Sequence, residues 1–331
     1  MQKNFEKDTR VDIKENYIKK LNDTLLTILL KDHSSGKNII WATDNYAMKG
    51  SAYSCQRHIT VKSITGRYGN VIKPRVTKSK KEQIHRVKDK AEVFTPSWIC
   101  NAQNNLIDNA WFGRKNVFNT EKDKLWKTNT KRIVFPKDKT WQDYVQANRM
   151  EISCGEAPYI CSRYDTVSGK WIELNNRIGI LDRKFRVINE NTNTKEDWLR
   201  WVQEAYKATY GFEWQGDSLL IARENLLFTF MDYYQGRFAE MPTNEMLQET
   251  AKIISWNIFQ MDGLKFVIPN SCKPVPKFKP SMFDLIEETD KEAYCPGCEK
   301  GDNKQHIGIY CKVMDWQKKR AIRFIDLTEG K

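Results

Sequence analysis

The sequence predicts an α/β fold, in which helices cover both faces of a mostly parallel sheet. From about residue 148 to 270, strand-like and helix-like stretches alternate, and this alternation is typical of βαβ units. The first strand-like stretch leads into a turn that holds Gly155 and the small Ala157, as tight strand-to-helix connections do. Apolar residues make up 40% of the 331-residue chain, which is enough to bury a substantial core.

Composition narrows the classes of function. The net charge of +13 arises from 55 Lys and Arg against 42 Asp and Glu, and it favours a polyanionic partner, nucleic acid first. A basic protein without such a partner is the alternative. No apolar run approaches the roughly 18 to 20 residues of a membrane span, and the N-terminus is polar, so we expect a cytoplasmic protein with no membrane partner. Eight scattered cysteines suit reduced thiols or a metal site better than disulfides.

Residues 1–90 are expected to form an N-terminal basic region. Apolar residues at helical spacing predict an amphipathic helix over residues 9–32. Residues 38–46 have the pattern of a strand that runs into a turn, and residues 57–72 contain short β-like pieces. The basic stretch over residues 73–90 is either a solvated linker or a segment that follows DNA phosphates. In the second case the candidate DNA contacts are Lys78, Lys80, Lys81, Arg86 and Lys88.

Residues 91–270 are expected to form the core domain. A helix is predicted over residues 95–112, where Thr-Pro supplies the start signal, and a shorter one over residues 141–150. Another helix is predicted over residues 195–209. The aromatic run 226–234 has helical length, and we expect it to pack against the sheet.

Three loops at one edge of the predicted sheet are candidates for binding a nucleoside. The first is the turn around Gly155, where backbone N–H groups at the start of a helix suit a carboxylate. A second strand is predicted from Arg177 to Leu181 and ends in Asp182, an acid suited to ribose hydroxyls. A third predicted strand leads to Asp217, which is placed to meet an adenine amino group. Because the carboxyl ends of parallel strands share an edge, we expect the three loops to converge on one ligand.

Two motifs, taken in their order along the chain, resemble those of a known family. Val93-Phe94-Thr95-Pro96 is similar to a Tyr/Phe-Thr-Pro segment, and residues 151–159 follow a glycine-rich cofactor motif with several changes. From about residue 90 to 331 the chain resembles the N-6 adenine-specific DNA methyltransferases, in particular the bacterial proteins called restriction endonuclease subunit M. The resemblance implies a Rossmann-like class I methyltransferase sheet that binds S-adenosylmethionine. The expected cofactor contacts are Phe94, Thr95, Pro96, Glu151, Cys154, Gly155, Ala157, Asp182 and Asp217.

Residues 253–263 are predicted as a fourth strand, where these enzymes carry Asn-Pro-Pro-Tyr or Asn-Pro-Pro-Phe. Asn257 is retained, both prolines are missing, and Phe259 stands one position earlier than the family's aromatic residue. The resemblance implies that Asn257 orients the adenine amino group, while Phe259 or Trp256 stacks on a base that is flipped out of the duplex. The alternative interpretation is an ordinary buried strand whose aromatic side chains fill the core.

The tail, residues 271–331, carries the spacing of a metal knuckle. Two cysteines in a Cys-Pro-Gly-Cys turn are followed by a histidine and a further cysteine, a donor set that suits a structural Zn²⁺ in tetrahedral geometry. Free thiols are the alternative. Residues 306–316 and 321–327 are predicted to form a hairpin that completes the sheet. The candidate metal ligands are Cys295, Cys298, His306 and Cys311, with Cys272 as a competing fourth ligand.

From these features we expect an enzyme that transfers a methyl group from S-adenosylmethionine to the exocyclic N6 of adenine in DNA, in restriction-modification or in phage-type modification. The missing prolines keep a second hypothesis open, a catalytically silent subunit that binds S-adenosylmethionine or DNA. A nuclease ranks lower, because we find no PD-(D/E)xK-like pair followed by the needed strand. Target recognition is expected from the first 90 residues, the tail, or a separate specificity or nuclease subunit.

Overall fold

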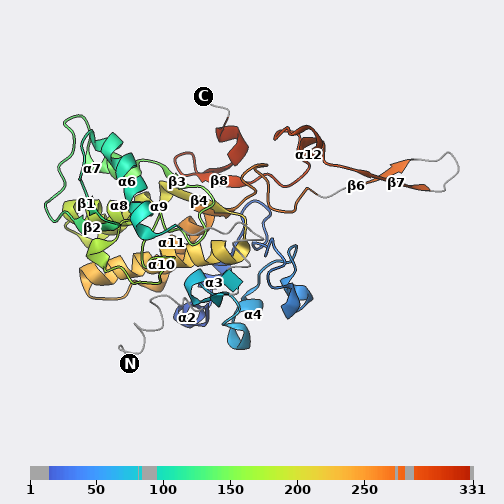
Figure 1. The fold of residues 1–331 in the computed structure, drawn as a ribbon, viewed down its shortest axis with the longest axis horizontal. Coiled ribbons are helices and arrows are strands. Elements are labelled where there is room, and N and C mark those ends of the chain that lie inside the picture. The colour runs from blue at the N-terminus through green and yellow to red at the C-terminus, as the bar shows by residue number, and fades with distance from the viewer. Residues whose placement is uncertain (1–14, 81, 84–94, 273–274, 280–286, 329–331) are drawn as a thin grey trace.

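The computed structural model describes residues 15–80, 82–83, 95–272, 275–279 and 287–328. These residues form a mixed α/β architecture of helices and small sheets (Figure 1). Within them, no helix is both long enough and apolar enough to cross a lipid bilayer. The α/β class expected from the sequence is therefore confirmed.

The sheet that organises the fold is parallel and consists of β3 (Arg149–Glu151), β4 (Thr209–Glu213) and β5 (Ile258–Gln260). The spatial order of the strands, β3-β4-β5, is also their order along the chain. In register, Glu151 lies opposite Gly211, and Glu213 lies opposite Gln260. The loops that follow the three strands therefore leave from one edge of the sheet. Three strands are fewer than a complete doubly wound sheet contains.

Two pairs of helices connect these strands. Between β3 and β4 the chain forms α8 (Ile180–Asn191) and α9 (Lys195–Lys207), and between β4 and β5 it forms α10 (Gly216–Phe238) and α11 (Asn244–Asn257). Helix α10 is buried along most of its length, including the aromatic run 226–234. The helices predicted over that run and over residues 195–209 are confirmed.

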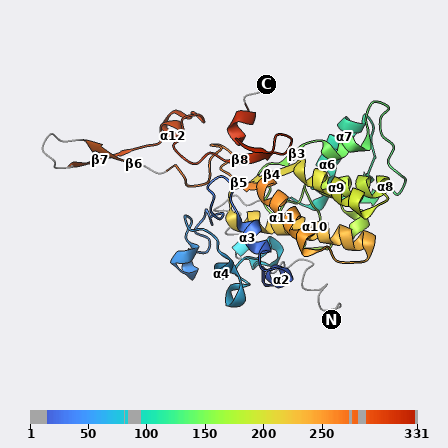
Figure 2. The ribbon, with the colours of Figure 1, turned by 180° about the vertical axis from the view of Figure 1, so that it is seen from behind.

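The N-terminal region begins with α2 (Glu15–Leu21) and α3 (Leu25–Leu30). The single helix predicted over residues 9–32 is therefore interrupted, and its first residues lie outside the described part of the chain. The interruption has a local cause: the side chain of Asn22 accepts hydrogen bonds from the backbone N–H and the hydroxyl of Thr24. Helix α3 packs against α10 and α11, as both views of the ribbon show (Figures 1 and 2).

Residues 38–80 contain no regular strand. The strand-like pieces predicted over residues 38–46 and 57–72 make only an isolated bridge between Ile40 and His58, and a second bridge joins Lys31 to Asn38. The rest of this region is built from short helical turns. These are η1 (Ala47–Lys49), η2 (Ser51–Tyr53), α4 (Val61–Ile64), η3 (Gly66–Tyr68) and η4 (Arg75–Thr77).

The stretch before the sheet follows the sequence prediction closely at its start. Helix α6 (Ser97–Phe112) confirms the helix predicted over residues 95–112, and Gly113 ends it in the left-handed conformation that suits glycine. The helix predicted over residues 141–150 is shorter than expected, because the chain turns extended before β3. The elements between α6 and β3 are β1 (Asn119–Lys122), β2 (Leu125–Thr128) and α7 (Trp141–Gln146).

One predicted strand is wrong, and another is confirmed only in part. Residues 177–181 follow the short turn η5 (Leu174–Asn176) and lead directly into α8, where the Asp182 carboxylate accepts the backbone N–H of Gly179 and caps the helix. The first part of the predicted strand 253–263 is the last turn of α11, so only β5 is extended. The residues after Gly155 form turns rather than the predicted helix.

The tail first forms a projecting pair of strands, called the β6–β7 arm below, and then folds back against the sheet. Strands β6 (Val275–Lys279) and β7 (Glu287–Ala293) form an antiparallel ladder that projects from the body of the molecule (Figures 1 and 2). The predicted hairpin of the last residues is confirmed, but it forms a separate two-stranded sheet and does not complete the parallel sheet as expected. The elements that follow the arm are α12 (Pro296–Lys300), β8 (Lys312–Asp315), β9 (Arg320–Arg323) and η6 (Phe324–Leu327).

Candidate functional site

The turn after β3 and the last residue of β4 meet at the carboxyl edge of the sheet. The backbone N–H of Gly155 donates a hydrogen bond of 2.8 Å to Oε2 of Glu213. The other oxygen, Oε1, accepts the backbone N–H groups of Trp214 and Gln215 at 2.9 and 3.0 Å. Gly155 has a φ of +53°, in the left-handed region that glycine adopts readily. One carboxylate thus collects N–H groups from the loops of two neighbouring strands.

Burial shapes the electrostatics of this edge. Desolvation raises the pKa of Glu213, while the hydrogen bonds from Gln215, Gly155 and Trp214 oppose that rise. Glu151, at the end of β3, is also buried, and desolvation raises its pKa well above the usual range. Its carboxylate accepts the N–H groups of Tyr159 and Ile160 and so fixes the end of the turn that follows β3. Glu151 shapes the loop, whereas Glu213 lies between the two loops.

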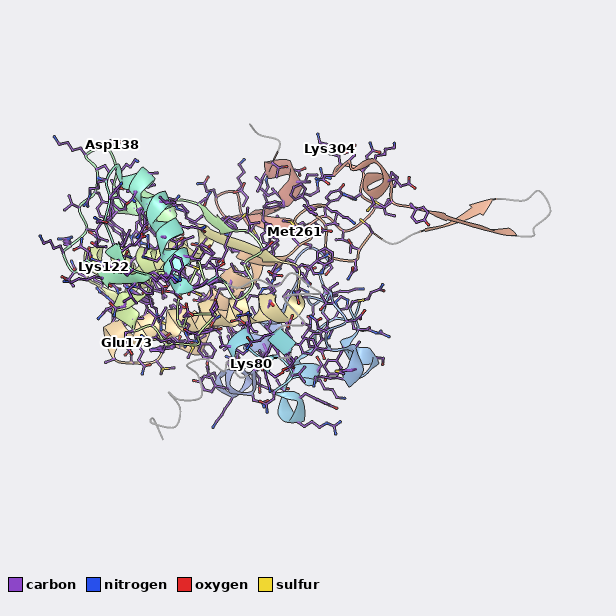
Figure 3. All side chains as sticks on the ribbon, viewed as in Figure 1. Lys80, Lys122, Asp138, Glu173, Met261 and Lys304 are labelled. Atoms are coloured by element: carbon purple, nitrogen blue, oxygen red, sulfur yellow. The ribbon has the colours of Figure 1, made fainter. Side chains whose placement is uncertain are left out.

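The third strand brings another acid to the same edge. Asp262 lies two residues after Gln260, the last residue of β5. Met261, which lies between them (Figure 3), is buried and donates its N–H to the carbonyl of Glu213. The Asp262 side chain accepts the N–H groups of Leu264 and Lys265 at 3.0 and 3.2 Å. Sequence reasoning missed both Glu213 and Asp262. The available signal was an acid at the very end of each strand-like run, Tyr-Gly-Phe-Glu and Phe-Gln-Met-Asp.

An N-terminal segment crosses the ends of β4 and β5. The side-chain amide of Gln260 bonds both the N–H and the carbonyl of Ile40, at 2.9 and 2.8 Å. The N–H of Gly216 donates to the carbonyl of Trp41, and the Asn45 amide donates to the side chain of Gln215. Residues 40–45 therefore pack directly against the carboxyl edge, beside the Gly155 turn.

The two acids predicted to bind the cofactor are engaged in other contacts. Asp182 is buried, and one of its oxygens accepts the N–H and hydroxyl of Ser162 at 2.9 and 3.0 Å, besides capping α8. Asp217 is buried as well, accepts the hydroxyl of Tyr46 at 2.7 Å and lies 3.7 Å from Nζ of Lys78. One oxygen of each carboxylate makes these contacts within the protein, so their assignment as ribose and adenine contacts stays a prediction that the contacts do not support.

The predicted catalytic group lies at the opposite edge. Asn257 ends α11 directly before β5, and its buried amide nitrogen contacts the carbonyls of Tyr206, Lys207 and Thr209 at 2.9, 2.9 and 3.2 Å. Its amide oxygen accepts the indole N–H of Trp316 at 2.9 Å. Both ends of the amide are used, and Asn257 stands at the start of a strand whereas Gly155 and Glu213 follow strand ends. These contacts do not support the catalytic role of Asn257, which stays a prediction.

The aromatic side chains predicted to stack on a base pack within the protein. Phe259 is buried in β5, with its ring 6.1 Å from that of Phe212 and 5.6 Å from that of Phe324. The Trp256 ring stacks on the His33 ring at 3.8 Å, with 8° between the planes. This pair is part of the contact between the N-terminal region and α11, so neither aromatic side chain faces the Gly155 turn as an open stacking surface.

The remaining predicted cofactor residues lie around the Gly155 turn. Phe94 lies outside the described residues. The carbonyl of Thr95 accepts the hydroxyl of Thr166 at 3.2 Å, and Pro96 directly precedes the first residue of α6. Cys154 is buried, and Ala157 adopts a φ of +63° inside the turn. The start of α6 is thus joined to the chain that follows the glycine turn, in line with the order of motifs in the sequence.

The predicted DNA-contacting lysines divide into two groups. Lys78 is buried, and its ammonium lies beside Asp217 rather than on the surface, so a direct phosphate contact by Lys78 is contradicted. Lys80 is exposed at the surface of the N-terminal region (Figure 3). The other three candidates, Lys81, Arg86 and Lys88, lie outside the described residues.

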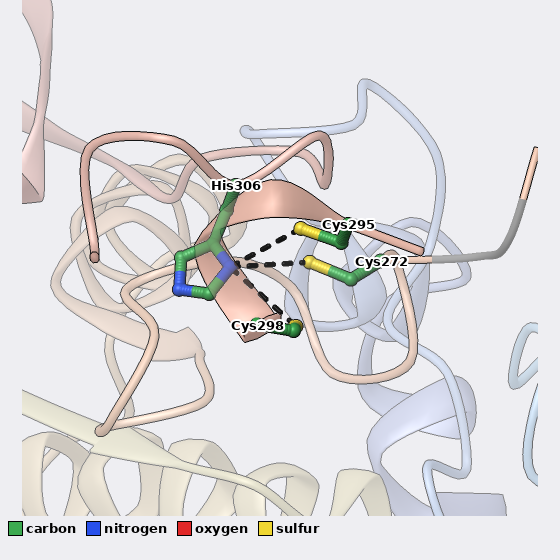
Figure 4. Close-up of side chains that lie close together, drawn as sticks. All are labelled: Cys272, Cys295, Cys298 and His306. Carbon is green, nitrogen blue, oxygen red and sulfur yellow. Dashed lines mark hydrogen bonds between the residues drawn. The ribbon is translucent and has the colours of Figure 1, made fainter. Parts of the chain in front are cut away.

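Four side chains of the tail converge as a metal-ligand set. The Nδ1 atom of His306 lies 3.5, 3.6 and 3.7 Å from the sulfur atoms of Cys295, Cys298 and Cys272, respectively (Figure 4). The four ligand atoms all lie within 4.8 Å of one another. Cys272 therefore takes the fourth position. The assignment of Cys311 is corrected: its buried thiol donates to the carbonyl of Gln260 instead.

The backbone around this cluster favours thiolate ligands. The N–H of Ile307 donates to the sulfur of Cys295 at 3.3 Å. Burial opposes the thiolate, but this N–H group, that of Cys298 and the side chains of His306 and Cys272 together lower the pKa of Cys295 to about 6. A Cβ atom on Gly297 would lie 2.6 Å from the backbone nitrogen of His306, so only glycine fits there. The cluster has the donors and the close packing of a metal centre.

A cavity of about 460 Å³ lies on the other side of the sheet, between its amino edge and the tail hairpin. Arg149, Lys207, Tyr210 and Trp316 are among the residues that line it. None of the predicted catalytic, cofactor or metal residues belongs to this lining.

No family model, no curated protein and no solved structure matches this chain in the comparisons with known proteins.

Proposed function

We propose that this chain binds S-adenosylmethionine at the carboxyl edge of β3, β4 and β5, as one half of a Rossmann-like sheet. The observation that carries the proposal is the Glu213 carboxylate, which ends β4 and reaches the N–H of Gly155. In nucleoside sites of this type an acid at a strand end accepts the ribose hydroxyls, and a glycine turn lets the ligand approach the backbone. Glu213 takes the first role, the Gly155 turn the second, and Asp262 faces the adenine.

The activity that we propose is methyl transfer to the exocyclic N6 of adenine in DNA. The methyl group leaves the sulfonium for the nitrogen, the sulfonium becomes a thioether, and the nitrogen loses one proton to solvent. This assignment rests on the order of the Phe-Thr-Pro and glycine motifs and on the net charge of +13. The engaged amide of Asn257 favours a second candidate, a subunit that binds the cofactor or DNA while another chain supplies the base-positioning group.

Calorimetry with S-adenosylmethionine tests the cofactor site. We expect the wild-type protein to bind one cofactor per chain and Glu213→Gln to bind at least tenfold more weakly, because the neutral amide is a poorer acceptor for two ribose hydroxyls. Glu196→Gln, on the exposed face of α9, is the matched control and should bind as the wild type does. No binding by wild type, or equal binding by Glu213→Gln, contradicts the proposal.

Transfer of a labelled methyl group to duplex DNA then separates the two candidates. Transfer by the purified chain supports the enzyme. Tight cofactor binding without transfer to any DNA supports the silent subunit, and a pull-down with the cofactor-loaded chain would then seek its partner.

We also propose that the Cys272, Cys295, Cys298 and His306 cluster holds Zn²⁺. Three sulfur donors and one imidazole are a common ligand set of structural zinc, and a fully protein-bound set leaves no open position for catalysis. Elemental analysis should find one zinc per chain. Cys298→Ser should lose it, whereas Cys55→Ser, at a cysteine far from the cluster in sequence, should keep it. A metal-free wild type after purification in zinc-containing buffer would contradict this assignment.

A further inference from the structure

The turn that carries Asp262 is held by a second segment of the tail. The N–H of Asp262 donates to the carbonyl of Val267 at 2.8 Å, which closes the turn. Behind it, the N–H of Ile268 donates to the carbonyl of Ile309 at 2.8 Å, and the N–H of Cys311 donates to the carbonyl of Phe266 at 3.0 Å. Residues 266–271 and 307–311 thus run side by side, although the whole β6–β7 arm separates them in sequence.

The metal ligands lie where these two segments end. Cys272 directly follows the first segment, and His306 directly precedes the second. Close packing joins them at Gly308, where a Cβ atom would lie 2.8 Å from the sulfur of Cys272. The hydroxyl of Ser271 accepts the N–H of Ile309 at 3.0 Å, next to the ligand cluster. A metal bound there would close the pair of segments at the end farther from the sheet.

The pair is short, and few hydrogen bonds hold it. Closing a long loop costs conformational entropy, and a metal whose ligands come from both sides of that loop offsets the cost. Here Cys272 lies before the arm, whereas Cys295, Cys298 and His306 lie after it. The bound metal would therefore hold together residues 266–271 and 307–311, which their few hydrogen bonds alone hold weakly.

We propose that the Cys3His metal centre is a clamp on the Asp262 turn, so that metal occupancy sets the affinity for the cofactor. This inference rests on the proposed cofactor site at Glu213 and Asp262 and names a means of regulating it. The connection from the metal to the sheet is continuous. The ligand cluster adjoins the paired segments 266–271 and 307–311, these segments hold the Asp262 turn, and the turn follows the end of β5. Removal of zinc frees the two segments, and the adenine-side wall loses its fixed position.

Hydrogen exchange and calorimetry on the full chain, with and without zinc, test the clamp. Treatment of wild type with a chelator should speed exchange of the amides in residues 262–268 and 307–311 at least tenfold, while α10 stays protected. The dissociation constant for S-adenosylmethionine should rise at least fivefold, and added Zn²⁺ should restore both values. Cys298→Ser, whose sulfur lies outside the paired segments, should behave as the chelated protein, and Cys55→Ser as the wild type.

The outcomes separate the clamp from the cofactor site. Unchanged exchange in residues 262–268 after zinc removal would overturn the clamp, whatever the protein binds. Faster exchange with an unchanged dissociation constant would overturn the link to the cofactor. If the zinc-loaded protein binds no S-adenosylmethionine while exchange responds to zinc, the proposed cofactor site fails, the link to the cofactor fails with it, and the clamp on the turn stands.

Discussion

The two edges of the parallel sheet place opposite kinds of side chain against the backbone. At the carboxyl edge, the carboxylates of Glu213 and Asp262 accept backbone N–H groups from the loops that follow the strands. At the amino edge, the amide of Asn257 and the side-chain nitrogen of Lys184 donate to backbone carbonyls. The Nζ atom of Lys184 lies 2.8 Å from the carbonyl of Ala147 and 3.0 Å from that of Ala208. Acids collect at one edge, and donors collect at the other.

The difference follows from the direction of the helices. Helix α10 begins just after β4 at the carboxyl edge, where its first N–H groups lack helical partners, and α9 and α11 end just before β4 and β5 at the amino edge, where their last carbonyls lack them. At the carboxyl edge, Oε2 of Glu213 takes a single N–H group, so a ligand's hydroxyl can bind to it beside that group. Donors at the amino edge satisfy carbonyls that are buried, so giving up these bonds to a ligand would leave polar groups unpaired. The carboxyl edge is suited to bind a ligand, and the amino edge to hold the fold together.

The largest expected effect is on stability, at the amino edge. Asn257→Ala removes the donors to three carbonyls and the acceptor of the Trp316 indole, all at a buried position. We expect a loss of about 2 to 4 kcal/mol in the free energy of unfolding, measured by urea denaturation. Trp316→Phe removes one of these bonds and should cost clearly less. At temperatures where Asn257→Ala stays folded, its affinity for the cofactor should equal that of the wild type. A variant with full stability but no methyl transfer would contradict the claim that the amino edge serves only to hold the fold together.

A smaller effect is expected in the pH dependence at the carboxyl edge. Desolvation raises the pKa of Glu213 above that of an ordinary glutamate, so acidification neutralises it earlier than a surface carboxyl. Because the neutral acid is a poorer acceptor for ribose hydroxyls, affinity for S-adenosylmethionine should fall as the pH falls towards that raised pKa. Calorimetry between pH 8 and 5 measures the fall. Glu213→Gln should bind weakly with a flat profile, and a profile in the variant as steep as that of wild type would assign the proton to another group.

The sequence predicted the class of fold and the individual helices better than it predicted the site. Helical spacing located α9, which has an apolar face, and the long aromatic run located α10, which is buried along most of its length. The Thr-Pro start signal located α6, whose buried face is largely polar. The cysteine spacing located the metal cluster, apart from the choice between Cys272 and Cys311. That choice depends on how the tail folds back on the sheet, and Cys272 lies on the far side of the β6–β7 arm from the other ligands.

Residue spacing alone could not identify Glu213 and Asp262 as the acids of the proposed site. Asp182 and Asp217 have the position expected after short apolar runs, but Asp182 caps a helix and Asp217 meets Tyr46 from a distant part of the chain. Short runs such as residues 177–181 do not distinguish a strand from the first turn of a helix. Once the true strands are known, Glu213 and Asp262 follow directly, because each ends or follows a strand of the sheet.

The smallest expected effect concerns the stack of His33 on Trp256, at the amino edge. Burial, together with the nearby charges of Arg223 and Lys31, lowers the pKa of His33 to about 3. The unfolded chain takes up this proton near pH 6.5 and the folded chain does not, so His33 contributes stability that is present above pH 6.5 and is lost as the pH falls from there to about 3. His33→Gln should lessen the fall in unfolding free energy between pH 7 and 4, by less than the roughly 1.4 kcal/mol per pH unit that one proton can supply. Equal falls in both proteins would show that the stack opens before the imidazole is protonated, and the amino edge would then be less rigid than the contacts of Asn257 and Lys184 imply.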